Sequence, residues 1–200
     1  MQKMDYTETE FLERYLEKVL TEKRLKHCYG VTEMACRLAS IYGIDKDKIY
    51  FTALAHDIAK CFSVELMNRM IRIHGLDPIY TNDRALAHSK VGAAILKDDF
   101  GITDSEVLNA VSNHTTGRYG MSIFEEIIYV SDAIEKNRTY SGAAELRERS
   151  LSDLDGVCLE VIDFSIKSLN EKRKPVDRDT LMAKKYIEEK ISKKENRRIK

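Results

Sequence analysis

The chain has 200 residues, with 33 basic and 33 acidic side chains, 43% hydrophobic residues and no tryptophan. This composition is typical of a soluble, helix-rich domain with its own core and argues against a disordered chain. No apolar run approaches the roughly 20 residues that span a bilayer, and the N-terminal residues lack the apolar core of a signal peptide. We therefore expect a cytoplasmic protein without a membrane partner. Its four cysteines form no C-x-x-C pair and are expected to be reduced and mostly packed.

Capping residues and glycines divide the chain into successive predicted helices. In chain order these cover 11–20, 31–43, a helix that carries 53–60, 64–75, 84–101, two helices that follow Thr103 and Ser122, and about 153–172. Capping boxes are expected for Thr7 with Glu10, Thr103 with Glu106, and Ser122 with Glu125. Asp45 and Ser63 are further expected caps, and helix ends are expected at Gly43, Gly75 and Gly101. The only β-like run, "EIIYV", follows a helical cap, so we predict an all-α fold.

The C-terminal end of the chain is basic. Between Lys172 and Lys200 there are twelve Lys or Arg and five Asp or Glu, so the rest of the chain carries the compensating negative charge. A solvated terminal helix explains this balance more simply than a nucleic-acid-binding tail, and nucleic acid is not an expected partner. We predict an N-terminal helix within 1–22 that packs on the domain, a main body over 23–172, and a C-terminal segment over 173–200 that ends in the basic helix.

Several polar side chains interrupt segments that otherwise have the pattern of buried helix. They are His27, His56, His88 and His114, together with Asp57 beside His56 and Asp132 after the apolar run "IIYVS". The fifth histidine, His74, lies in the last turn before Gly75, where an imidazole suits the negative end of the helix dipole. Burying the other polar groups is costly unless something pairs with them.

A metal ion would offset that cost, because neutral imidazoles and carboxylates are the ligands of zinc, iron and manganese. Adjacent residues on a helix diverge by about 100°, so His56 and Asp57 can converge on an ion that lies between their two directions. His27 and Asp132, from distant helices, would complete the set. The pattern predicts a metal site.

Basic residues follow each of these ligand motifs. Lys60 lies four residues after His56 on the expected helix, and Arg138 lies six residues after Asp132. Arg118 follows "HTTG", a turn whose hydroxyls and backbone N–H groups suit phosphate oxygens. The pattern favours an anionic, phosphate-bearing substrate beside the metal.

The ordered motifs "HDIAK", "AHSKVGA", "NHTTGR", "DAIEKNRTYSG" and "RKPVDRDTL" resemble those of the HD-domain metal-dependent phosphohydrolases. Within that family they resemble a bacterial branch, the YqeK-type symmetrical diadenosine tetraphosphate hydrolases. The resemblance extends from about Leu25 to Tyr186. It implies a single HD-domain helical bundle, a divalent transition metal that is typically iron, and hydrolysis of a dinucleoside polyphosphate, diadenosine tetraphosphate, to two ADP.

The resemblance also implies residue roles. The implied metal ligands are His27, His56, Asp57 and Asp132, and the implied catalytic residues are Asp57, Lys60 and Asp132. The implied substrate-binding residues are His27, Lys60, His88, His114, Thr115, Arg118, Asp132 and Arg138. A closing segment over the nucleoside end would add Lys172, Arg173, Lys174, Pro175, Val176 and Asp177.

Some alternatives stay open on the sequence. His88 and His114 either hydrogen-bond phosphate or hold a second metal with Asp57 as the bridge. Rival functions are an HD phosphohydrolase acting on deoxynucleotides or cyclic nucleotides, an iron oxygenase or oxygen carrier, and a non-enzymatic metal-bound adaptor that uses its basic tail on RNA. A homodimer is compatible with the sequence.

Overall fold

The structure, a computed structural model, describes residues 6–7 and 9–198. Within these residues it has ten α-helices, one short 3-10 helix and no strand, which confirms the all-α prediction. The elements are α1 (Glu10–Val19), α2 (Glu22–Tyr42), α3 (Lys46–Ala55), α4 (Val64–Ile73), η1 (Pro78–Tyr80), α5 (Arg84–Asp98), α6 (Ser105–Asn113), α7 (Ile123–Ile134), α8 (Ala143–Arg149), α9 (Leu154–Glu171) and α10 (Arg178–Arg198). Residues 1–5, 8, 199 and 200, which belong to the expected N-terminal and basic segments, lie outside the described residues.

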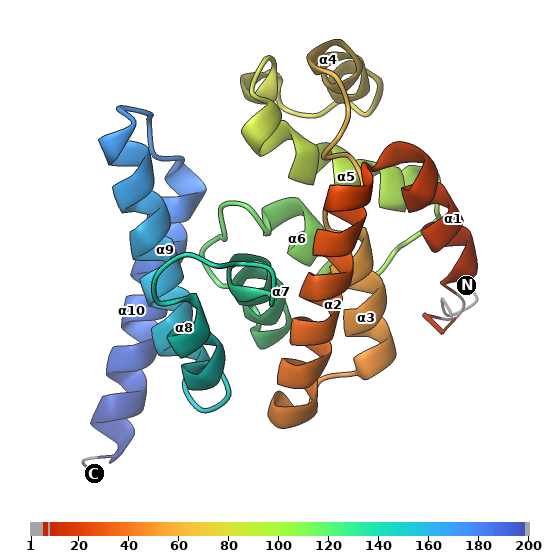
Figure 1. Ribbon diagram of the computed structural model, residues 1–200. Coiled ribbons are helices and arrows are strands. Elements are labelled where there is room, and N and C mark those ends of the chain that lie inside the picture. Colours follow the sequence, from red (N-terminus) through yellow and green to blue (C-terminus); the bar gives the residue numbers. More distant parts are fainter. Residues whose placement is uncertain (1–5, 8, 199–200) are drawn as a thin grey trace.

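The helices pack around a central pair, α2 and α7 (Figure 1). Helix α2 also packs on α3, and α6 contacts both α5 and α7. Helices α9 and α10 lie side by side at one edge, and α9 joins them to α7 (Figure 1). The core holds large side chains such as Leu38, Phe51, Ile95 and Phe124, each at most 1% exposed. None of the described helices combines the length and apolar character needed to span a bilayer.

Most of the predicted helix boundaries are confirmed. Asp45 accepts hydrogen bonds from the first N–H groups of α3, and Ser63 caps α4. Ser122 and Glu125 form the predicted capping box at the start of α7. Gly43 adopts φ 69°, in the left-handed region that suits a residue just after a helix. The four cysteines are free thiols, as expected.

Two predicted capping boxes are wrong. Helix α1 begins at Glu10 with Thr9 in the capping position, two residues later than the Thr7 box requires, and the Thr9 side chain makes no capping bond. At α6 the cap is Asp104, whose Oδ1 accepts from the Glu106 N–H at 2.9 Å, and not Thr103. A short carboxylate at Asp104 satisfies the free N–H groups directly, so the helix starts one residue later than predicted.

Two predicted helix bounds differ by more than one turn: α2 begins at Glu22, nine residues before the predicted start at Val31, and α3 ends early. The sequence pattern extends this helix through Lys60, but α3 ends at Ala55 and His56 is the residue that follows it. Residues 56–61 form tight turns, with the N–H of Lys60 donating to the carbonyl of Asp57 at 2.8 Å. The His56-Asp57 pair therefore lies on a turn, and helix geometry does not set the directions of its two side chains. Helices η1 and α8 have no counterpart among the predicted elements.

Candidate metal and phosphate site

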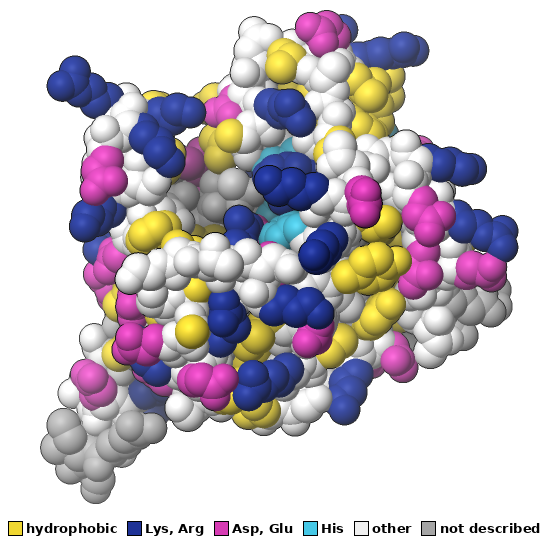
Figure 2. Space-filling model, viewed as in Figure 1, with side chains coloured by type: hydrophobic (Ala, Val, Ile, Leu, Met, Phe, Trp, Pro, Cys, Tyr) yellow, Lys and Arg dark blue, Asp and Glu magenta, His cyan; other side chains and the backbone are white. Residues whose placement is uncertain are grey.

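Six of the predicted polar residues meet at one place in the fold. His27 comes from α2, His56 and Asp57 from the turn after α3, His88 from α5, His114 from the end of α6, and Asp132 from the last turn of α7. His56, Asp57, His88 and His114 are at most 3% exposed. Figure 2 shows histidine side chains at the floor of a hollow that Lys and Arg side chains border. We call these six residues the Asp57 cluster.

His56 and His114 are positioned by the same local device. Each is the residue that follows a helix, and its Nδ1 lies near the carbonyl three residues earlier, Ala53 at 2.6 Å and Val111 at 2.8 Å. The last carbonyls of a helix lack partners within it, so an Nδ1–H that donates to one satisfies both groups. This bond places the proton on Nδ1 and leaves the Nε2 lone pair directed into the cluster.

His27 and His88 also direct Nε2 into the cluster, and other groups hold their Nδ1 atoms. The Nδ1 of His27 lies 3.2 Å from Glu135 Oε1, and the Nδ1 of His88 lies 3.3 Å from the carbonyl of Arg84. A metal-binding histidine typically donates its other ring N–H to a carboxylate or a carbonyl, which fixes the tautomer and raises the basicity of the ligand nitrogen. All four imidazoles therefore present Nε2 to the interior of the cluster.

Asp57 stands between two groups of ligand atoms. Its Oδ2 lies 3.5 Å from His56 Nε2 and 3.9 Å from His27 Nε2. Its Oδ1 lies 3.2 Å from His88 Nε2 and 3.4 Å from His114 Nε2, and these two nitrogens are 3.0 Å apart. Asp132 extends the first group, with Oδ1 at 3.0 Å from His27 Nε2. Each side of Asp57 therefore collects several electron-pair donors.

The donor set fits a metal ion. The buried atoms His27 Nε2, His56 Nε2 and Asp57 Oδ1 have no hydrogen-bond partner. Three sets of three residues offer ligand atoms, and within each set these atoms lie within 4.8 Å of one another. Each set includes Asp57 or Asp132. A metal ion between these atoms would offset the cost of burying them. Burial would lower the pKa of His56, but the carboxylates of Asp57 and Asp132 outweigh burial and raise that pKa, which shows that positive charge is favoured at this place. The site thus has groups able to hold a metal ion.

The charge states agree with this role. Burial alone would raise the pKa of Asp57, but the facing imidazoles of His56, His114 and His88 outweigh it and hold that pKa well below its usual value. The pKa of Asp132 is lowered despite burial, chiefly by its contact with His27. Burial lowers the pKa of His114 to about 4. Both carboxylates are therefore ionised at neutral pH, and His114 is neutral with a free lone pair.

Three of the predicted phosphate-binding residues stand beside the cluster. Lys60 Nζ lies 3.0 Å from His88 Nε2 and 3.7 Å from Asp57 Oδ1. Thr115 Oγ1 lies 3.3 Å from His88 Nε2. Arg138 donates to Asp132 through Nη2 to Oδ1 at 2.9 Å and through Nε to the backbone carbonyl at 3.0 Å. These cationic and hydroxyl groups are therefore close enough to meet a ligand bound at the cluster.

Other predicted residues are not brought into contact with the cluster. Arg118 forms a two-pronged ion pair with Glu125, at 2.7 and 2.5 Å, near the start of α7. The segment 172–177 is the connection between α9 and α10, and its first four residues are exposed. Lys172 in this segment donates to Ser168. The substrate roles of Arg118 and of this segment stay predictions.

The sequence argument missed two neighbours of the ligands. Arg24 Nη1 donates to Asp57 Oδ2 at 2.8 Å, and Glu135 accepts from the backbone N–H of Asn137 while it contacts His27. Arg24 precedes His27 by three residues on α2, and Glu135 follows Asp132 by three. One-turn spacing from a candidate ligand was therefore the available signal for both residues.

Two cavities flank the cluster. One, of about 710 Å³, is bounded by Lys23, Arg24, Lys60 and Arg84 among others. A smaller one, of about 300 Å³, also contains Lys23 and Arg24 and reaches Arg138. Both are rich in basic side chains, which suits an anionic ligand.

Comparisons with known proteins show the family of the chain. The HD domain profile matches residues 24–155. The symmetrical bis(5'-nucleosyl)-tetraphosphatase of Halalkalibacterium halodurans is 38% identical over 164 residues, which cover 81% of this chain and 87% of that protein. The Bacillus subtilis protein of the same name is 33% identical over 173 residues, covering 86% and 93%. A crystal structure from Clostridium acetobutylicum, described as a predicted HD superfamily hydrolase involved in NAD metabolism, superposes with a TM-score of 0.86 at 35% identity, covering 94% of this chain and 100% of that one.

Proposed function

Because the chain belongs to the HD-domain family and, within it, to the symmetrical bis(5'-nucleosyl)-tetraphosphatases, we propose that it cleaves diadenosine tetraphosphate into two ADP. The observation that carries this proposal is the Asp57 cluster itself. Its inward-facing acceptors suit a metal ion, and the two basic cavities beside it suit a polyphosphate chain.

His27, His56, Asp57 and Asp132 would hold a divalent transition metal, for which the family resemblance suggests iron. When bound, such an ion supplies a water of lowered pKa as the nucleophile and polarises the phosphorus centre. His88 Nε2, His114 Nε2 and Asp57 Oδ1 form a further ligand set, which supports a second ion at that position.

The protein's own residues complete the chemistry. Lys60 and Arg138 stand on different sides of the cluster, where their N–H groups can bind phosphate oxygens and stabilise the charge of the transition state. Thr115 offers a hydroxyl to the same oxygens. The departing ADP is a weak base, so its oxygen needs these N–H donors more than it needs a strong general acid.

Further parts of the proposal concern substrate placement and assembly. One ADP-sized half would lie toward Arg138, with the segment 172–177 closing over its nucleoside end and its last phosphate directed at Asp57. The cut would then be symmetrical because this half extends two phosphates from its nucleoside. ADP is the proposed product and inhibitor, and a homodimer is the proposed assembly.

Product chromatography tests the activity. The purified protein is incubated with diadenosine tetraphosphate in ¹⁸O water, and we expect ADP as the sole nucleotide product, with one labelled ADP per turnover. ATP and AMP in equal amounts would contradict the proposed placement of the substrate. Turnover of deoxynucleotides or cyclic nucleotides in its place would favour the rival phosphohydrolase function.

A further inference from the structure

All of the charged side chains that line the larger basic cavity are basic. Its residues include the cations Lys23, Arg24, Lys60 and Arg84, together with the hydroxyls of Thr21 and Thr115, and none of the described lining residues is acidic. We call it the cationic cavity. Its volume of about 710 Å³ is large enough for a substantial small-molecule ligand.

Two of its cations, like several other basic residues of the described chain, have no ion-pair partner, whereas many others are paired. Lys48, for example, lies 2.8 Å from both Asp104 and Glu106, and Lys184 lies 2.6 Å from Asp163. Within the described residues no ion pair involves Lys23 or Arg84. Arg84 instead donates through Nη2 to the backbone carbonyl of Lys60 at 2.9 Å, which holds its guanidinium at the cavity wall.

The cationic cavity continues directly from the Asp57 cluster. Lys60 and Thr115 line it and also contact His88. Arg24 lines both this cavity and the smaller one that reaches Arg138, and it donates to Asp57 at 2.8 Å. The two cavities therefore share Arg24, which contacts the central carboxylate.

We propose that the cationic cavity binds the phosphate chain of the second half of the substrate, the half that departs, through Lys23, Arg24 and Arg84. The ligand class is a nucleoside polyphosphate that crosses the Asp57 cluster with one half in each cavity. The identity of the substrate rests on the proposed function, but the binding of polyphosphate in this cavity does not.

The test compares two double variants of the metal-loaded protein. In Lys23→Gln with Arg84→Gln, two unpaired cavity cations are neutralised. In the matched control, Lys46→Gln with Arg72→Gln, two exposed cations that do not line the cavity are neutralised. Binding of inorganic tripolyphosphate is measured by calorimetry, and KM is measured for diadenosine tetraphosphate.

We expect the cavity variant to bind tripolyphosphate about tenfold more weakly or worse, because at least one charge-assisted hydrogen bond is lost. We also expect a comparable rise in KM and no change in either quantity for the control. Equal affinities and KM values in the wild type and the cavity variant would overturn the inference. If no diadenosine tetraphosphate is cleaved while the cavity variant alone loses tripolyphosphate affinity, the inference stands and the proposed substrate is wrong.

Discussion

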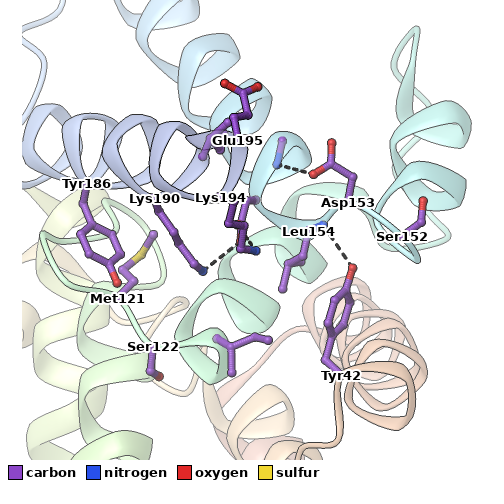
Figure 3. Close-up of a pocket in the computed structure, with 14 residues that line it drawn as sticks. Tyr42, Met121, Ser122, Ser152, Asp153, Leu154, Tyr186, Lys190, Lys194 and Glu195 are labelled. Carbon is purple, nitrogen blue, oxygen red and sulfur yellow. Dashed lines mark hydrogen bonds and ion pairs between the residues drawn. The ribbon is translucent and has the colours of Figure 1, made fainter. Parts of the chain in front are cut away.

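Two buried polar clusters in this molecule differ in how their charges are satisfied. The first is the Asp57 cluster, and the second is a network of ion pairs between α7, α9 and α10. There Lys190 Nζ contacts Glu126 at 2.5 Å and Asp155 at 2.9 Å, and Lys194 contacts Asp155 at 2.5 Å. Both lysines line a cavity of about 720 Å³, shown in Figure 3.

The difference lies in the atoms that face inward. In the network each carboxylate meets an ammonium group from α10, so the protein supplies its own cations. In the Asp57 cluster four imidazole nitrogens and two carboxylates converge. Three of these atoms lack a hydrogen-bond partner, as do Glu126 Oε2 and Asp155 Oδ2 in the network, but only the cluster brings imidazole nitrogens together. The cavity of about 720 Å³ therefore belongs to a network of ion pairs, whereas the imidazoles able to hold a metal ion belong to the Asp57 cluster.

The largest expected effect follows from Asp57→Asn. Because Asp57 stands between both groups of ligand atoms, we expect the variant to lose most of its metal, and activity to fall by at least roughly a hundredfold. Metal analysis and turnover measure this. Stability should also fall, because imidazoles are left buried without their ion.

The matched control for Asp57→Asn is Asp155→Asn in the structural network, which should keep its metal. A fully metallated and active Asp57→Asn protein would remove Asp57 from the ligand set.

Lys190→Met tests the other side of the comparison. The substitution leaves Glu126 and part of Asp155 buried without an ammonium partner, so the free energy of unfolding should fall by about 3 kcal/mol. Urea denaturation measures the change, and metal content should be retained. Lys193→Met, at an exposed neighbouring position, is the control and should leave stability unchanged. Equal stability of the two variants would show that the network does not fasten α10.

Lys60→Ala separates substrate binding from metal binding. The variant should retain its metal, because an ammonium group is no ligand, yet bind nucleotide more weakly by roughly 1.5–3 kcal/mol if one charge-assisted hydrogen bond is lost. Equilibrium binding of ADP measures the effect. Unchanged affinity would make Lys60 an ordinary surface cation.

Glu135→Gln tests the support of a ligand. The carboxylate holds the Nδ1 side of His27, so metal affinity should fall by about 10- to 100-fold, the usual cost of losing such a partner. Competition with a chelator measures the affinity. Glu33→Gln, which removes an exposed carboxylate of the same helix as His27, is the control. Identical chelator sensitivity in all three proteins would contradict this role.

The last expected effect is a pH dependence from Glu126. Burial raises its pKa from 4.5 to about 7, against the opposing influence of Lys190. Between these two values the folded state binds more protons than the unfolded state, so this group makes stability fall as pH rises, by at most about 1.4 kcal/mol per pH unit. Glu126→Gln should flatten that part of the stability profile. Identical slopes in both proteins would contradict the assignment.

Sequence reasoning succeeded where the signal is local. The Ser122 capping box and the Gly43 helix end depend on neighbouring residues, and both are confirmed. The structure also brings His27, His56, Asp57 and Asp132 together, as the metal prediction requires, although their role as ligands stays a prediction. Polar residues in apolar segments are a strong signal because burying them needs a specific partner.

The features that escaped prediction depend on tertiary contacts. The Glu126–Lys190 pair joins residues that are 64 positions apart, and the residue pattern of neither helix predicts this contact. Arg118 follows a turn whose sequence suits phosphate binding, but its guanidinium forms an ion pair with the carboxylate of Glu125. The early end of α3 escaped because "ALAHDIAK" has helical composition, whereas the His56 side chain competes for the carbonyl of Ala53.

The most direct measurement is anomalous diffraction from crystals of the purified, metal-loaded protein. We expect a peak within bonding distance of His27 Nε2, His56 Nε2, Asp57 and Asp132, with any second peak beside His88 and His114. A metal bound instead at Asp155 and Glu126 would contradict the proposed metal site. So would full activity of a protein preparation whose crystals show no metal peak at the Asp57 cluster.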